Sequence, residues 1–158
     1  MKLINIQTSD SETFEVEWEA ARQSQIIRKM LDDLSIEENI IPISNEKVIG
    51  PVFKKALVWM ENNRGYPDFQ EDDDDNKVKK NWNHLNEWEK QYIEMSGDEI
   101  DMIPLLVCGN FLEIKGLVRL MIKAVALKIN SKRSEEEIRK TYKIEDPKLL
   151  RQLLTFLD

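Results

Sequence analysis

Hydrophobic positions in the first part of the chain alternate between patterns typical of strands and patterns typical of helices. Two short apolar runs, 3–6 and 13–16, flank the polar cluster 8–11, and this arrangement predicts a β-hairpin. A brief helix is expected over 17–22. Ser24 then has the chemistry of an N-cap for a segment whose apolar residues have helical spacing. The start of the chain is therefore predicted to mix strands and helices.

The next segments predict a strand, a helix and a loop. Residues 40–43 form a β-branched run interrupted by a proline, which is typical of an edge strand. Helical periodicity is strongest over 46–63, although Gly50-Pro51 weakens the first turn. Residues from about 64 to 81 contain glycine, proline, lysines and four consecutive aspartates, a composition that predicts a solvated, disordered loop.

The apolar stripes after this loop all have helical spacing. We expect a short amphipathic helix around residues 88–93 and an apolar helix over 100–111. Pro104 must kink that second helix or lie in its first turn. A further helix is predicted over 114–129. Strands and helices first, followed mostly by helices, predict an α+β fold.

The C-terminal segment is predicted to form two short helices. Residues 134–137, Ser-Glu-Glu-Glu, form a capping box, and Asp146-Pro147 has the chemistry of a second helix start. The last eleven residues, KLLRQLLTFLD, contain six large apolar side chains. Burying them is worth roughly 9–18 kcal/mol at most, and so short a helix is unstable alone. It must therefore dock, either on this chain's own helical half or on a partner's helix.

Composition and charge restrict the classes of partner. The formal net charge of -7 disfavours binding to phosphate backbones, so no nucleic-acid partner is expected. Cys108 is the single cysteine, which excludes a disulfide framework within the chain and fits a reducing compartment. The N-terminus turns polar too early for a signal peptide, and no apolar run approaches the roughly 18 residues of a membrane span. We expect a cytoplasmic and nuclear protein with no membrane partner.

The residues that could carry chemistry form no recognisable catalytic or metal site. His84 is the only histidine and has no cysteine or carboxylate at metal spacing, and Cys108 lies in an apolar run like a buried small hydrophobe. No glycine-rich phosphate loop is present. The acidic run 72–75 lacks the glycine and closing glutamate of a calcium loop. We predict no metal, no cofactor and no enzymatic activity.

The segment GNFLEIKGL at 109–117 raises a separate question, because Gly109, Asn110 and Phe111 interrupt two hydrophobic segments. A core requires neither a glycine nor an amide there. The segment is either a tight connector or a surface that a partner recognises. In the first case Phe111 would be buried and Asn110 would cap the next helix; in the second, both would form part of an interface.

Four segments together resemble the Skp-type adaptor of SCF (Skp–cullin–F-box) ubiquitin ligases. They are TSDSETFEVEWEAARQS at 8–24, IPISN at 41–45, NFLEIKGL at 110–117 and EEIRKTYKI at 136–144. The resemblance implies a BTB/POZ fold over residues 1–130 and a two-helix C-terminal extension over 131–158 that binds F-box proteins. It also implies a non-catalytic adaptor, which bridges a cullin scaffold to F-box substrate receptors and so supports substrate ubiquitination and degradation.

The same resemblance implies two sets of binding residues. Asn45, Asn110 and Phe111 would face the cullin. The F-box protein would contact Gly116, Leu117, Ile138, Arg139, Tyr142, Ile144, Leu149, Leu150 and Leu153. For the tail residues, the alternative to F-box contact is that they pack against one another within this chain and form a small hydrophobic core of their own (a mini-core).

This chain departs from the family pattern in three places. Phe111 stands where the family has tyrosine, Pro104 interrupts a helix that the family leaves unbroken, and the match fades after Ile144. A different class of function is also compatible with the residues, namely a self-associating structural scaffold that uses the same apolar surfaces outside a ligase. That hypothesis predicts a homodimer when the chain has no partner.

Overall fold

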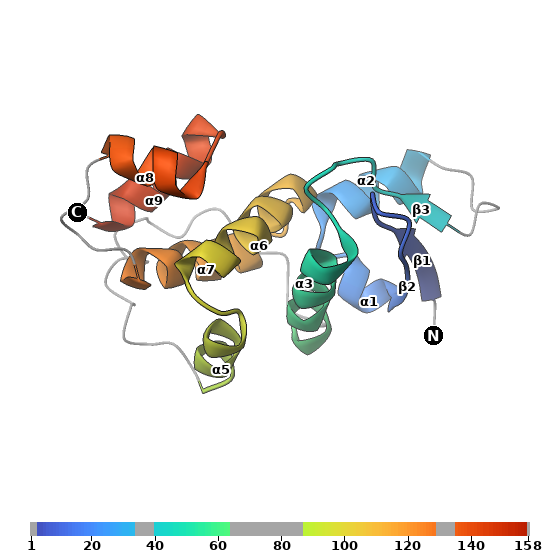
Figure 1. Ribbon diagram of the computed structural model, residues 1–158. Helices are drawn as coiled ribbons and strands as arrows, with labels where there is room; N and C mark the ends of the chain where they lie inside the picture. Colours follow the sequence, from blue (N-terminus) through green and yellow to red (C-terminus); the bar gives the residue numbers. More distant parts are fainter. Residues whose placement is uncertain (1–2, 34–39, 64–86, 129–134, 158) are drawn as a thin grey trace. The chain divides into compact units, whose positions relative to one another are not determined.

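The computed structural model describes residues 3–33, 40–63, 87–128 and 135–157 of the chain (Figure 1). Contacts divide the chain into two compact units. Among the described residues, the first unit contains 3–63 and Val107–Leu117, and the second contains 87–106 and 118–157. A small sheet and several helices make up the described residues, so the predicted α+β class is confirmed.

The helices and strands follow the predicted order. The elements of the described residues are β1 (Leu3–Gln7), β2 (Thr13–Glu17), α1 (Trp18–Ala21), α2 (Gln25–Asp33), β3 (Ile40–Pro42), α3 (Gly50–Asn62), α5 (Glu87–Met95), α6 (Glu99–Leu112), α7 (Lys115–Lys128), α8 (Glu135–Tyr142) and α9 (Pro147–Leu157).

The sheet belongs to the first unit and has the strand order β2-β1-β3. β1 and β2 pair antiparallel with Ile6 opposite Phe14, and β1 and β3 pair parallel with Ile6 opposite Ile41. The predicted hairpin and the predicted edge strand are thus both confirmed. Alternation along the strands buries one face of the sheet, to which Ile4, Ile6, Val16 and Ile41 contribute.

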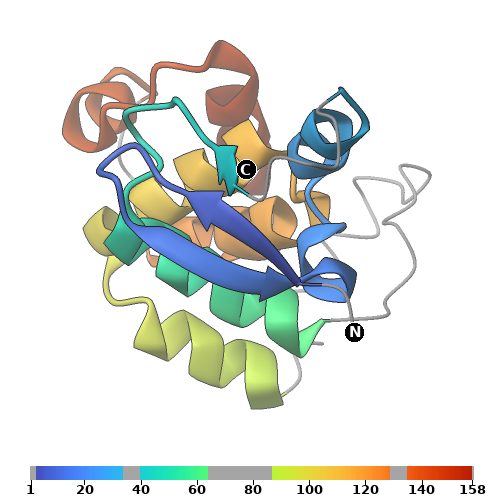
Figure 2. The ribbon, with the colours of Figure 1, turned by 90° about the vertical axis from the view of Figure 1, so that its right-hand side faces the viewer.

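Helix α3 packs against this buried face. The rings of Phe14 on β2 and Phe53 on α3 lie 5.1 Å apart in a tilted arrangement. Ala56 and Met60 follow Phe53 at helical spacing and are also buried. Figure 2 shows the green helix α3 behind the blue strands β1 and β2. Sheet and helix therefore share one core within the first unit.

The start of α3 corrects the predicted boundary, because the helix begins at Gly50 and not at residue 46. The carboxylate of Asp10, in the hairpin turn, accepts the Gly50 N–H at 3.0 Å. Pro51 lies at the first helical positions, where a missing N–H costs nothing. Hydrogen bonds from Thr8 and from the Gly50 N–H stabilise the charged carboxylate, so the pKa of Asp10 lies below its ordinary value. Gly50-Pro51 thus marks the start of the helix.

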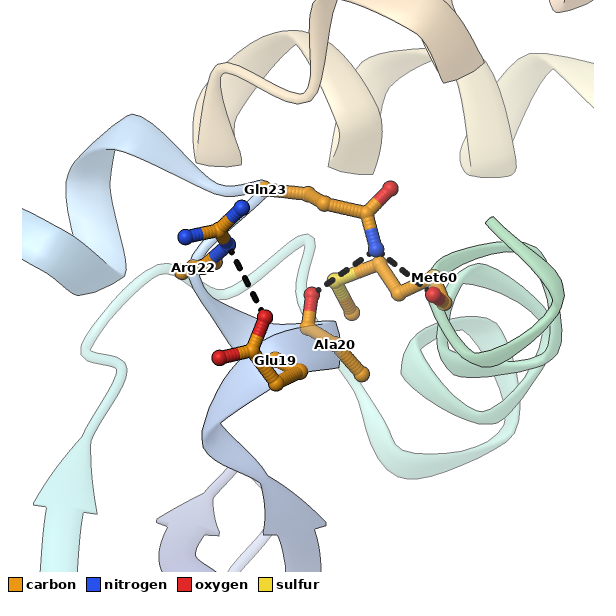
Figure 3. A network of polar contacts seen from close by, with 5 residues as sticks. All are labelled: Glu19, Ala20, Arg22, Gln23 and Met60. Atoms are coloured by element: carbon orange, nitrogen blue, oxygen red, sulfur yellow. Dashed lines mark hydrogen bonds and ion pairs between the residues drawn. The ribbon is translucent and has the colours of Figure 1, made fainter. Parts of the chain in front are cut away.

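The side chain of Gln23 joins the end of α1 to the end of α3 (Figure 3). Its amide nitrogen donates to the carbonyl oxygens of Ala20 at 3.1 Å and Met60 at 2.6 Å. Both acceptors lie in the last turn of a helix, where carbonyl groups lack partners within the helix. An ion pair of 3.4 Å between Glu19 and Arg22 lies beside this bridge. The bridge holds the short segment between α1 and α2 in place.

Proline placement and capping are informative for helices α6 and α9. Pro104 lies inside α6, beyond its first turn, which excludes one of the two predicted placements, and the helix continues to Leu112. The Asp146 carboxylate accepts the Lys148 N–H at 2.9 Å, which confirms the predicted start of α9. On α5 the rings of Trp88 and Tyr92 stack with their centroids 5.1 Å apart.

Several predictions fall on residues outside the described ranges. These are the loop at about 64–81, His84, the acidic run 72–75 and Ser134 of the capping box. The division between a domain at 1–130 and an extension at 131–158 also falls there, and it stays a prediction. Within the described ranges, each helix is too short or too polar to cross a bilayer.

Candidate functional interface at the end of helix α6

The segment Gly109-Asn110-Phe111 is not a connector, because all three residues lie within α6. The chain turns at Glu113 and Ile114 instead. The Ile114 N–H donates to the Gly109 carbonyl at 3.0 Å, and the Glu113 N–H donates to the Asn110 carbonyl at 3.2 Å. These two bonds are the Schellman pattern that ends many helices.

Glu113 adopts the left-handed conformation at this turn, with φ of 55°. Glycine usually occupies that position, and a residue with a side chain costs about 1–2 kcal/mol more there. The Lys29 ammonium lies 3.8 Å from the Glu113 carboxylate. Both side chains are partly exposed, so this pair contributes little. Tertiary contacts must therefore hold Glu113 in place.

Phe111 is exposed at this turn, with 36% of its surface accessible. Its neighbours Leu112 and Ile114 are fully buried. The alternative in which Phe111 is buried and Asn110 caps the next helix is thus wrong. From Met102 to Leu112 the sequence has no charged residue. An exposed aromatic ring beside an amide, on a helix end without charges, is typical of residues at the centre of a protein interface.

Asn45, the third predicted cullin-facing residue, lies on the connection between β3 and α3. Its side-chain oxygen accepts the Lys47 N–H at 2.8 Å, and its carbonyl accepts the Val48 N–H at 3.0 Å. This local turn is a well-known role for asparagine. Asn45 is half-exposed and belongs to the same unit as Asn110 and Phe111. A structural role and an interface role are compatible at this position.

The predicted F-box-contacting residues divide into an exposed one and a buried group. Arg139 is exposed on α8. The apolar members of the set are each 5% exposed or less: Leu117, Ile138, Tyr142, Ile144, Leu149, Leu150 and Leu153. The tail members of this set are therefore already removed from water in the free chain, as the mini-core alternative predicts. Among the residues of α8 and α9 whose side chains the structure describes, the exposed positions are mostly polar, for example Arg139, Lys148 and Gln152.

Gly116, the remaining predicted F-box residue, lies where α7 passes close to α3. A Cβ atom at this position would come within 2.7 Å of the Trp59 ring. Such a distance is too short for any real contact, so the two helices can approach this closely only with glycine at position 116. The structure thus gives Gly116 a packing role.

We expect Gly116→Ala to destabilise the protein by about 1–2 kcal/mol, because the steric cost of overpacking outweighs the better helix propensity of alanine. Thermal and urea denaturation of the full chain measure this change. In a Trp59→Leu background, which removes the ring, the same substitution is expected to be neutral or stabilising. Equal destabilisation in both backgrounds would show that the ring contact is irrelevant.

Burial shifts the pKa of two titratable side chains among the described residues, Cys108 and Lys123. Cys108 is fully buried, and this burial raises the pKa of its thiol to about 12, so the thiol stays protonated at neutral pH. The predicted role of Cys108 as a buried small hydrophobe is confirmed. Burial also lowers the pKa of Lys123, which lies near Glu89. Among the described residues, no three histidine, cysteine or acidic side chains lie together as a metal site would require.

Sequence reasoning missed how the end of α6 is held. The Ser24 hydroxyl donates to the Leu112 carbonyl at 2.5 Å, and the Gln25 N–H donates to the Glu113 carbonyl at 3.4 Å. The predicted N-cap role of Ser24 is confirmed, because its oxygen accepts the Ile27 N–H at 3.1 Å. Its second bond joins residues 88 positions apart, so no local pattern could predict it.

Comparison with known proteins assigns this fold to a known class. Residues 2–65 match the family described as "Skp1 family, tetramerisation domain". The first part of the chain is therefore a domain of the POZ class, followed by helices. The chain as a whole belongs to the Skp1 family, because relatives of at least 30% identity match it along most of its length.

Three relatives show the extent of the match. "E3 ubiquitin ligase complex SCF subunit sconC" of Talaromyces marneffei is 33% identical over 143 residues, which cover 90% of this chain and 85% of the relative. "Skp1-related protein" of Caenorhabditis elegans is 31% identical, with 90% and 81% covered. "SCF ubiquitin ligase complex protein SKP1a" of Dictyostelium discoideum is 30% identical, with 92% and 86% covered.

Proposed function

We propose that this chain is a non-catalytic adaptor that bridges a cullin scaffold to F-box substrate receptors in an SCF-type ubiquitin ligase. The F-box protein would select the substrate, and the adaptor would support its ubiquitination. Two relatives are named as subunits or proteins of SCF ligase complexes, and they match nearly the whole of this chain. The protonated thiol of Cys108 is consistent with a role without catalysis.

The exposure of Phe111 is the observation that carries the cullin side of the proposal. Large aromatic residues supply much of the binding energy of interfaces when they enter a partner's pocket. Phe111 stands in the last turn of α6, and residues 102–112 carry no charge, so the nearest charged residue along the chain is Glu113, which pairs with Lys29. Asn110 beside it and Asn45 on the β3–α3 connection would supply amide hydrogen bonds to the same partner.

The F-box side requires α8 and α9 to act as a folded platform. The apolar residues of the predicted set in the tail, from Ile138 to Leu153, are buried in the free chain, and they would contribute by holding the two helices together. The partner would then contact exposed residues, of which Arg139 belongs to the predicted set. This assignment separates two roles that the sequence alone could not separate, namely supporting the surface and touching the partner.

Reconstitution from purified components tests this function. The full chain, the N-terminal domain of a cullin and an F-box peptide are combined and analysed by size-exclusion chromatography with light scattering. We expect a complex with one copy of each component and no requirement for a metal or cofactor. A chain that forms dimers and binds neither partner would favour the self-associating scaffold. Imaging of a tagged chain would test the proposed cytoplasmic and nuclear location.

A further inference from the structure

We propose that Ser24 is a positioning residue for Asn110 and Phe111, the residues proposed to face the cullin, and that it acts through the end of α6. This inference rests on the proposed function of Asn110 and Phe111. Ser24 lies between α1 and α2, and its side chain is fully buried. Because Ser24 is not exposed to solvent, its effect on a partner must pass through the backbone that carries the Phe111 ring.

The Ser24 hydroxyl forms hydrogen bonds to two different helices, one as a donor and one as an acceptor. Its proton goes to the Leu112 carbonyl at 2.5 Å, and its oxygen accepts the Ile27 N–H at 3.1 Å. A hydroxyl group has one proton to donate and two lone pairs to accept with. The same group therefore caps the start of α2 and satisfies a carbonyl at the end of α6.

The end of α6 depends on this bond, because the last carbonyl groups of a helix have no partner within it. The Gly109 and Asn110 carbonyls receive the N–H groups of Ile114 and Glu113. The Leu112 carbonyl belongs to a fully buried residue and receives the Ser24 hydroxyl. The positive end of the α2 dipole also meets the negative end of α6, since the Gln25 N–H donates to the Glu113 carbonyl.

Strain at Glu113 makes this support necessary. Its left-handed conformation, with φ of 55°, is unfavourable for a residue with a side chain. The contacts of Ser24 and Gln25 flank that residue on the α2 side. Ser24 is itself held in place, because its neighbour Gln23 is bonded to Ala20 and Met60 (Figure 3). Without the Ser24 hydroxyl, the buried Leu112 carbonyl would lose its donor, and the turn next to Phe111 could relax.

The test compares Ser24→Ala and Ser24→Gly with a matched control in the full chain. Both variants remove the donor to Leu112, whereas glycine remains an acceptable N-cap for α2. Ser96→Ala is the control, because Ser96 is also buried and donates a 2.7 Å bond, but to Tyr92 in the second unit. Binding of a cullin N-terminal domain and of an F-box peptide is measured by calorimetry at a temperature where every variant is folded.

We expect both Ser24 variants to weaken cullin binding by about tenfold or more and to leave F-box binding within about twofold. Ser96→Ala should leave cullin binding unchanged. Amide hydrogen exchange should become faster at Glu113 and Ile114 in the Ser24 variants alone, which a general loss of stability would not produce. Unchanged cullin binding in both Ser24 variants, or equal loss of both partners, would overturn the positioning role.

One further variant separates failure of this inference from failure of the proposed function. Asn110→Lys combined with Phe111→Lys alters the proposed cullin-contacting residues themselves. If this double variant loses cullin binding while the Ser24 variants keep it, the cullin site stands and the role of Ser24 is refuted. If the double variant keeps full cullin binding, the site assignment is refuted, and the positioning role fails with it.

Discussion

Replacing both Asn110 and Phe111 by lysine is expected to weaken cullin binding by at least about 100-fold, or roughly 2.7 kcal/mol. The two ammonium groups would have to be desolvated against an apolar contact, and the ring that enters the partner would be lost. Binding of an F-box peptide should change by less than about twofold. Titration calorimetry with each partner measures both effects on the same preparation.

A matched control separates lost contact from lost stability. Val58 on α3 is 38% exposed, close to the 36% of Phe111, and it belongs to the same unit. Val58→Lys places an ammonium group on a similarly exposed apolar residue of a different helix. This variant should bind the cullin normally. Equal weakening by Val58→Lys and by the double variant would show that the effect is not specific to the end of α6.

Replacing Leu153 by alanine is expected to destabilise the C-terminal helices by about 2–5 kcal/mol and to abolish F-box binding. Leu153 is fully buried on α9, an eleven-residue helix, and a helix of that length has little stability without packing. Loss of this side chain would therefore release α9 and remove the platform. Cullin binding should persist, because Asn110 and Phe111 lie in the first unit. Circular dichroism melts and binding to both partners check this result.

The neighbouring residue provides the control for Leu153. Gln152 is exposed on the same helix, so Gln152→Ala should leave the melting temperature nearly unchanged and F-box binding intact. A Leu153→Ala variant that melts like the unmodified chain but fails to bind the F-box peptide would contradict the platform interpretation. It would indicate that Leu153 touches the partner directly.

Local patterns were sufficient to predict most helices and strands. The hairpin, the edge strand with Pro42 and the start of α9 at Asp146-Pro147 follow from spacing and capping chemistry within a few residues. The boundary of α3 was wrong by four residues, because Asp10, 40 residues earlier, caps Gly50. Of the two placements predicted for Pro104, the structure excludes the first turn, because Pro104 lies inside α6.

The candidate site was predicted in part. The family resemblance identified Asn110 and Phe111, and the structure shows Phe111 exposed at a helix end. It also identified Gly116 and the tail leucines. At these positions the sequence cannot distinguish a buried core residue from a partner-contacting residue, because both environments exclude water. Only the folded chain shows that Gly116 lies under Trp59 and that Leu149, Leu150 and Leu153 are buried.

The amino-acid sequence by itself determined the α+β class, the family and the order of the elements, since each depends on periodicity, caps or short motifs. Tertiary structure decided which apolar residues face solvent and which buried polar groups meet. Ser24 and Leu112 show the reason most clearly, because their hydrogen bond joins residues 88 positions apart. A local pattern carries no information about such a partner, and only the packing of α2 against the end of α6 brings the two together.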